Sequence, residues 1–164
     1  MKTIYLAGPD VFELDAIERG KEYVKLCEKY NFKGLFPLDN IINFNQEKEE
    51  IAKEIFIKNC ELIDKSDIVI ANLNLFRGKE ADSGTVWECG YAFAKGKEVY
   101  GYMDDLSSYV KKFNDNEKHL ENGKYLDNQN KEIENFNLPI NLMIACSSIK
   151  LIQGNLEDVL LYLN

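Results

Sequence analysis

One short segment, residues 67–73, constrains the fold of this chain more than any other. It reads Asp-Ile-Val-Ile-Ala-Asn-Leu, an almost continuous run of β-branched and apolar residues. Strands that are buried on both faces have this composition, which is typical of the centre of a parallel sheet covered by helices on both sides. The segment therefore predicts an α/β protein built around a central strand.

Other strand-like and helix-like segments alternate around this one. Strands are expected at residues 2–7, 33–37, 99–103 and 149–152, and helices at residues 12–30, 47–65, 83–95, 138–147 and 156–163. This alternation favours one α/β domain over residues 1–164, with a flavodoxin-like, doubly wound sheet of about five parallel strands and flanking helices. In such sheets the ligand lies beyond the carboxyl ends of the strands, here the loops after residues 7, 37, 73 and 103.

Charge and cysteine usage narrow the class of protein. A formal net charge of -8, from 28 acidic and 20 basic residues, repels phosphate backbones, so nucleic-acid polymers and anionic membranes are not expected partners. The apolar run at residues 2–7 is too short for a signal peptide. Four scattered cysteines without metal-type spacing are interpreted as small buried residues. Together these features predict a cytoplasmic protein.

The scarcity of histidine limits the kinds of catalysis that this chain can carry out. His119 is the only histidine, and it lies in a very polar stretch. A Ser-His-Asp triad, a Cys-His pair or a multi-histidine zinc site would each depend on this one residue. Catalysis is therefore expected from carboxylates, tyrosines and amides, with no metal and no organic cofactor.

A polar insertion at about residues 104–137 differs in composition from the rest of the chain. It holds seven asparagines among many lysines and glutamates. A loop of this length inside a compact domain is usually functional or mobile. Three interpretations remain open, namely a surface insertion without a role, an active-site lid and a subunit contact.

Residues 76–92, which follow the central strand, hold the most informative polar side chains. Asp82 or Ser83 can cap the helix that begins there, and Glu88 lies about one and a half turns into it. Gly84, four residues earlier on the same helix face, leaves open space over the Glu88 carboxylate. The helix N-terminus is expected to keep Glu88 ionised as a nucleophile.

Asp82 and Glu88 together suggest a reaction class. Two carboxyl groups that flank one bond are what cleavage of a glycosidic C–N or C–O bond requires. On spacing alone, the alternative is that Glu88 is a surface charge and Asp82 only a helix cap.

Several segments in order along the chain resemble the nucleoside 2-deoxyribosyltransferase family. The matching segments are residues 4–9 (Ile-Tyr-Leu-Ala-Gly-Pro), 36–40 (Phe-Pro-Leu-Asp-Asn), 67–73, 76–78 (Phe-Arg-Gly), 82–85 (Asp-Ser-Gly-Thr), 88–92 (Glu-Cys-Gly-Tyr-Ala), 96–97 and 139–143 (Pro-Ile-Asn-Leu-Met). Any one of them is weak evidence, whereas their order over nearly the whole chain is specific.

The resemblance implies a role for several residues. It implies that Glu88 forms a deoxyribosyl ester, that Tyr5 hydrogen-bonds and positions Glu88, and that Asp82 engages the nucleoside. It also implies that Asn141 reaches the sugar in a neighbouring subunit's site. The other candidate substrate-binding residues are Gly8, Phe12, Asp39, Asn59, Ser83 and Met143. Phe12 is expected to stack on the incoming base.

The chain departs from the family pattern at two positions. Many family members have an aspartate that assists the base where this chain has Asn59, and an amide supplies no proton at neutral pH. A glutamine that often contacts the base is replaced by Ile41. The proton donor and the preferred base are therefore left open.

Two alternative functions share this fold. A nucleoside or 5′-nucleotide N-glycoside hydrolase of the phosphate-binding kind needs Ser, Arg or backbone amides after the first strand. The chain instead has Gly8-Pro9-Asp10 there, and Asp10 is expected to repel a phosphate. A non-catalytic nucleotide-binding module needs no paired carboxylates.

The favoured reading is a transferase that exchanges the base of a 2′-deoxynucleoside for a free nucleobase, with retention at C1′. Its expected partners are those two substrates and further copies of the chain, since the resemblance implies a homo-oligomer with a shared active site.

Overall fold

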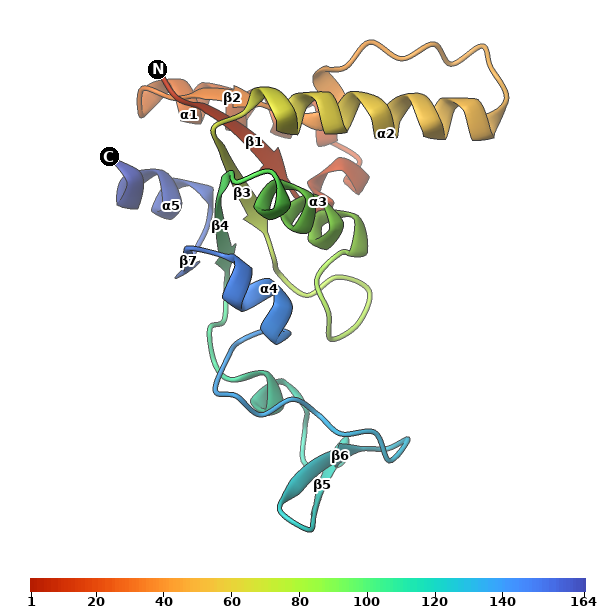
Figure 1. Ribbon diagram of the computed structural model, residues 1–164, viewed down its shortest axis with the longest axis vertical. Coiled ribbons are helices and arrows are strands. Elements are labelled where there is room, and N and C mark those ends of the chain that lie inside the picture. Colours follow the sequence, from red (N-terminus) through yellow and green to blue (C-terminus); the bar gives the residue numbers. More distant parts are fainter.

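Five parallel strands form the main sheet of the protein. The computed structural model describes residues 1–164 and has these strands: β1 (Thr3–Ala7), β2 (Lys33–Leu35), β3 (Ile68–Asn72), β4 (Glu98–Met103) and β7 (Lys150–Gln153). Their order is β2-β1-β3-β4-β7, with β3 in the middle (Figure 1). The predicted doubly wound, flavodoxin-like sheet and its central strand are therefore confirmed.

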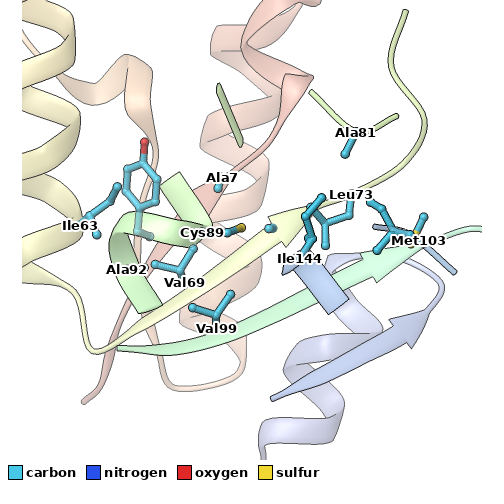
Figure 2. Packing of buried hydrophobic residues seen from close by; sticks show 13 residues of the cluster. Ala7, Ile63, Val69, Leu73, Ala81, Cys89, Ala92, Val99, Met103 and Ile144 are labelled. Atoms are coloured by element: carbon cyan, nitrogen blue, oxygen red, sulfur yellow. The ribbon is translucent and has the colours of Figure 1, made fainter. Parts of the chain in front are cut away.

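Helices cover both faces of this sheet. The helices are α1 (Ala16–Lys29), α2 (Lys48–Lys65), α3 (Ser83–Ala94), α4 (Leu142–Ser147) and α5 (Leu156–Leu163). One buried cluster joins the sheet to α1 and α5, and a second joins it to α2, α3 and α4. Figure 2 shows the second cluster, in which Val69 and Val99 lie close to Cys89 and Ala92 of α3.

The alternation of side chains along β1 decides what each face receives. Ile4 and Leu6 pack in the cluster of α1 and α5, whereas Tyr5 and Ala7 pack in the cluster of α3. Successive side chains of a strand point to opposite faces, so the odd-numbered residues of β1 face α3. Tyr5 is thereby directed toward the helix that carries Glu88.

Two expected helices and one expectation on burial need correction. Residues 9–12 form a 3-10 turn, Pro9–Phe12, and α1 begins only at Ala16. The helix expected from residue 138 begins at Leu142, because Asn141 caps it and accepts a hydrogen bond from the Met143 amide. The cysteines are not all buried, since Cys60 is partly exposed and Cys146 is exposed.

The polar insertion has secondary structure of its own. It contains a 3-10 turn, Tyr109–Lys112, and an antiparallel hairpin of β5 (Lys118–Glu121) and β6 (Lys124–Asp127) that extends away from the main sheet (Figure 1). Asn122 and Gly123 both have positive φ in the turn of this hairpin, as Asn-Gly turns require. A small apolar cluster of Tyr109, Val110 and Ile133 stabilises the insertion.

No helix of the protein has the length and apolar character that a membrane span requires.

Candidate active site

A cavity of about 510 Å³ lies where the loops after β1 and β2 meet the first turns of α3. Its lining residues are Gly8, Val11, Phe12, Ile17, Pro37, Leu38, Asn40, Ile42, Phe44, Ile55, Asn59, Asp82, Gly84, Thr85 and Glu88. The wall is largely apolar, its only ionisable side chains are Asp82 and Glu88, and none of its residues is basic. Such a cavity suits a planar, uncharged ligand with one polar end.

Glu88 is held in this wall by a hydrogen bond from Tyr5. The Tyr5 hydroxyl donates to Glu88 Oε1 at 2.6 Å, and the two residues are 83 positions apart in the chain. Tyr5 is fully buried, so its ring has little freedom to move. The carboxylate is therefore fixed at one oxygen while Glu88 lines the cavity.

Burial strongly perturbs the ionisation of Glu88. Desolvation raises the pKa of Glu88 to about 7, against the hydrogen bond from Tyr5, which acts to lower it. The nearby charge of Asp82 raises this pKa further, and the side chain of Asn59 lowers it. The expectation that the helix N-terminus keeps Glu88 ionised is therefore not met. Glu88 is the sixth residue of α3, and the helix dipole acts mainly on the first turn.

Tyr5 is a donor to Glu88 over the whole physiological range. Burial, with the adjacent Glu88 charge, raises the pKa of Tyr5 far above its ordinary value. A phenol that stays protonated can only donate to a carboxylate acceptor, which favours the ionised form of Glu88 over the protonated one.

Asp82 both caps α3 and lines the cavity. Its Oδ2 accepts from the Thr85 amide and the Thr85 hydroxyl, each at 2.9 Å, which confirms the predicted cap. Oδ1 makes no hydrogen bond within the chain and is free for a ligand. A Cβ at Gly84 would lie 3.2 Å from Asp82 Oδ2, so the glycine leaves room beside this carboxylate. Gly84 and Glu88 both line the cavity.

A second, smaller hollow of about 290 Å³ adjoins the first at Glu88. It is lined by Phe56, Asn59, Gly84, Trp87 and Glu88, so Glu88, Gly84 and Asn59 belong to both hollows. Asn59 Oδ1 accepts from Asn40 Nδ2 at 3.2 Å, which leaves the Asn59 amide hydrogens available to the site. The nucleophile candidate thus lies between an apolar hollow and an aromatic one.

The loop after β1 provides one wall of the larger cavity. A Cβ at Gly8 would come within 2.9 Å of the Asn72 side chain, so the glycine lets the loops after β1 and β3 approach. The Phe12 ring is 57% exposed and lines the cavity. Asp10 is buried, accepts hydrogen bonds from Tyr23 and Asn72, and does not line the cavity, so its expected repulsion of a phosphate there has no support.

Besides Tyr5, which contacts Glu88 but lines neither hollow, four of the candidate residues lie outside both hollows. Asp39 accepts a hydrogen bond from the Phe36 amide and thereby holds the loop after β2, and Ser83 is exposed at the start of α3. Asn141 donates to Glu134 in the same chain, and Met143 is 71% exposed. The fold of one chain therefore brings together Tyr5, Gly8, Phe12, Asn59, Asp82 and Glu88.

Much of the apolar wall was not identified from the sequence. The missed lining residues include Leu38, Ile42, Phe44, Ile55, Phe56 and Trp87. The rule that ligands lie beyond the carboxyl ends of strands reaches Leu38, which follows β2. The others come from the loop before α2 and from exposed helix positions, and a single sequence carries no signal for them.

Comparison with known proteins gives a consistent picture. The family model described as nucleoside 2-deoxyribosyltransferase matches residues 4–143. A solved structure of a 2-desoxiribosyltransferase from Leishmania mexicana is 31% identical, with a TM-score of 0.76 over 99% of this chain and 97% of the other. A 2-deoxyribosyltransferase from Bacillus psychrosaccharolyticus is 21% identical, with a TM-score of 0.60 over 96% and 89% of the two chains, and shares the fold.

One curated relative is longer. An uncharacterised protein of Schizosaccharomyces pombe is 34% identical over 116 residues, which are 66% of this chain. The match covers 53% of that protein, so the aligned part is about half the length of the curated relative.

Proposed function

Because the chain belongs to the nucleoside 2-deoxyribosyltransferase family, we propose that it exchanges the base of 2′-deoxynucleosides through a covalent deoxyribosyl ester on Glu88. The observation that carries this proposal is the hydrogen bond from the buried Tyr5 hydroxyl to Glu88 Oε1 at the wall of a largely apolar cavity. A carboxylate restrained at one oxygen keeps the other in position for attack on a bound sugar.

In the first step, Glu88 attacks C1′ of the bound deoxynucleoside. The C1′–O bond to the carboxylate forms while the C1′–N bond breaks, and its electron pair leaves with the base. In this proposal Asp82 Oδ1, which has no hydrogen-bond partner in the chain, accepts a hydrogen bond from the nucleoside. Asn59 can hydrogen-bond the departing base but cannot protonate it.

In the second step, a nitrogen of the incoming base attacks C1′ from the side that the first base vacated and releases its proton to solvent. The ester bond breaks and its electron pair returns to Glu88. Two inversions give net retention. The apolar wall with Phe12 favours a planar base over water as acceptor, and stacking on Phe12 contributes to its binding.

The charges of the site support a nucleoside substrate. The ionisable groups that line the cavity are two carboxyl groups, so a 5′-monophosphate would meet no basic residue in the cavity wall. A ribose 2′-hydroxyl would lie beside Glu88, where a hydrogen bond to the carboxylate would weaken its attack. Both points favour 2′-deoxynucleosides.

A second copy of the chain completes the site in this proposal. Asn141 and Met143 lie outside the cavity of their own chain, and Met143 is exposed at the start of α4. Trp87 and Phe56 of the adjoining hollow are also exposed, at 46% and 53%. Apolar surface of this kind beside a site is typical of an interface. We further propose a cytoplasmic location, in keeping with four unpaired cysteines.

Base exchange tests the proposal directly. The protein is incubated with a 2′-deoxynucleoside and a different free base, and both nucleosides and free deoxyribose are followed by chromatography. Exchange that exceeds hydrolysis is expected. Deoxyribose released without added base as fast as exchange occurs with it would instead make the protein a hydrolase.

The covalent step is tested separately by mass spectrometry. Wild type quenched with a deoxynucleoside should carry a deoxyribosyl adduct on the peptide that contains Glu88, and Glu88→Gln should carry none. An adduct on another peptide would assign the nucleophile elsewhere.

A further inference from the structure

Arg77 lies over Phe12, one of the two aromatic residues that line the larger cavity. The Phe12 and Phe76 rings stack with their centroids 5.5 Å apart and an angle of 16° between their planes. The Arg77 guanidinium carbon is 5.3 Å from the Phe12 centroid and 4.6 Å from the Phe76 centroid. The cation therefore contacts both rings of the stack.

These rings are the partners that hold Arg77. It forms no salt bridge in the chain, although 28 acidic residues are present. A guanidinium packed on aromatic faces is attracted by their electron density and also restricts their rotation. Phe12 is 57% exposed and lies at the end of a short 3-10 turn, so apart from its stacking on Phe76 the contact with Arg77 is what restricts its ring.

The backbone of the loop is strained where it presents this side chain. Arg77 has a φ of 49° and the following Gly78 a φ of 143°. A residue with a side chain adopts positive φ at a free-energy cost, and such positions persist only where surrounding contacts impose them. The strained backbone at Arg77 supports the view that the contacts of its side chain with Phe12 and Phe76 impose this conformation.

The polar insertion holds the other end of the same loop. Lys79 donates to the Lys112 carbonyl and to Glu117 Oε2, each at 2.8 Å, and lies over the Phe113 ring. The Tyr109 hydroxyl hydrogen-bonds to Glu80. The insertion thus contacts the two residues that follow Gly78 and restrains the loop there.

We propose that Arg77 is a positioning residue that fixes the Phe12 ring as the stacking surface for the nucleobase, with the loop held in place by the insertion. The inference rests on the proposed function. A ring that is already immobile loses less conformational entropy when a base stacks on it, so a fixed Phe12 raises the affinity for bases without touching the reacting atoms. The insertion is then neither a lid nor a segment without a role, but a support for this wall.

The test separates base affinity from chemistry. Steady-state exchange is measured for wild type, Arg77→Ala and Arg77→Lys with adenine, hypoxanthine, cytosine and thymine as acceptors, and the affinity of each base is measured by calorimetry. For every base that wild type uses, Arg77→Ala should raise KM and Kd about tenfold, with kcat within about twofold. Arg77→Lys, which keeps the charge without the planar group, should fall between the two.

A double-mutant cycle identifies the route through Phe12. In the Phe12→Leu background, Arg77→Ala should have no further effect on KM or Kd, because the ring that Arg77 holds is gone. Additive effects of the two substitutions would overturn the inference. Lys29→Ala is the matched control, because Lys29 at the end of α1 lies 5.1 Å from the Tyr30 ring and does not line the cavity. This substitution should leave KM and Kd unchanged.

The possible results separate a failure of the proposed role of Arg77 from a failure of the proposed transferase function. Exchange by wild type with unchanged KM and Kd in Arg77→Ala overturns the role of Arg77 and leaves the transferase intact. Bases that bind to wild type without exchange would refute the transferase, and the Kd comparison would still decide on Arg77. If no base binds to wild type, both fail.

Discussion

Replacing Glu88 with glutamine should stabilise the protein in a way that depends on pH. The substitution keeps the shape of the side chain and an oxygen that can accept the hydrogen bond from Tyr5, and removes the charge. Burial raises the pKa of Glu88 to about 7, compared with 4.5 for an unperturbed glutamate. The ionised carboxylate is therefore unfavourable in the folded state.

The sign and size of the effect follow from this difference in pKa. Below pH 4.5 Glu88 is protonated in both states and stability is complete. Between pH 4.5 and 7 the unfolded chain releases the proton while the folded chain retains it, so the free energy of unfolding falls as the pH rises. Above pH 7 the loss levels off at about 3 kcal/mol, from 1.36 kcal/mol for each pKa unit. Glutamine has no such loss.

Urea unfolding of both proteins at pH 4 and pH 8.5 measures this directly. The advantage of Glu88→Gln over wild type should grow by about 3 kcal/mol between the two pH values, a midpoint shift of about 1 to 2 M urea. All other titrating groups are common to both proteins and cancel. Glu61→Gln, an exposed residue of α2, is the control, and its difference from wild type should change by less than about 0.5 kcal/mol. An advantage of Glu88→Gln that is the same at both pH values would refute the reasoning.

Four further outcomes are expected. Glu88→Ala should lower base exchange at least about 10³-fold in a folded protein, and full activity would exclude Glu88 as nucleophile. The rate of base exchange by wild type should rise with pH through about 7 as Glu88 ionises. Because Tyr5→Phe removes a hydrogen bond to the carboxylate, it should move this rise to higher pH and lower the rate about 10- to 100-fold. An unchanged pH profile in Tyr5→Phe would contradict the role of Tyr5. Mixing Glu88→Ala with Asn141→Ala should restore part of the activity through mixed assemblies, and a fully active monomer in sedimentation would exclude a shared site. A deoxynucleoside should be used at least about tenfold better than its 5′-monophosphate in kcat/KM comparisons, and the reverse preference would show that a cation reaches the site.

Most of the fold could be predicted from the chain alone. The runs at residues 2–7 and 67–73 and the helical segments between them are local patterns, and their alternation admits little besides a parallel sheet. The helix cap at Asp82 could also be predicted from the sequence, because the Thr85 amide that donates to it is only three residues away. The hairpin of the insertion was missed although Asn122-Gly123 marks its turn, since the polarity of its surroundings hid the signal.

Part of the candidate site could also be predicted from the sequence, and the rest depends on tertiary packing. The sequence by itself determined that Glu88 lies in a helix behind a capping aspartate at the ligand edge of the sheet, because spacing along a helix settles which residues are neighbours. The hydrogen bond from Tyr5 to Glu88 was expected only from the family resemblance, and the structure contains it at 2.6 Å. Tertiary structure alone decided that burial moves the pKa of Glu88 to about 7 and that Asp39 holds a loop instead of lining the cavity. Desolvation and contacts between distant residues depend on how the layers pack, and that packing is a property of the whole folded chain.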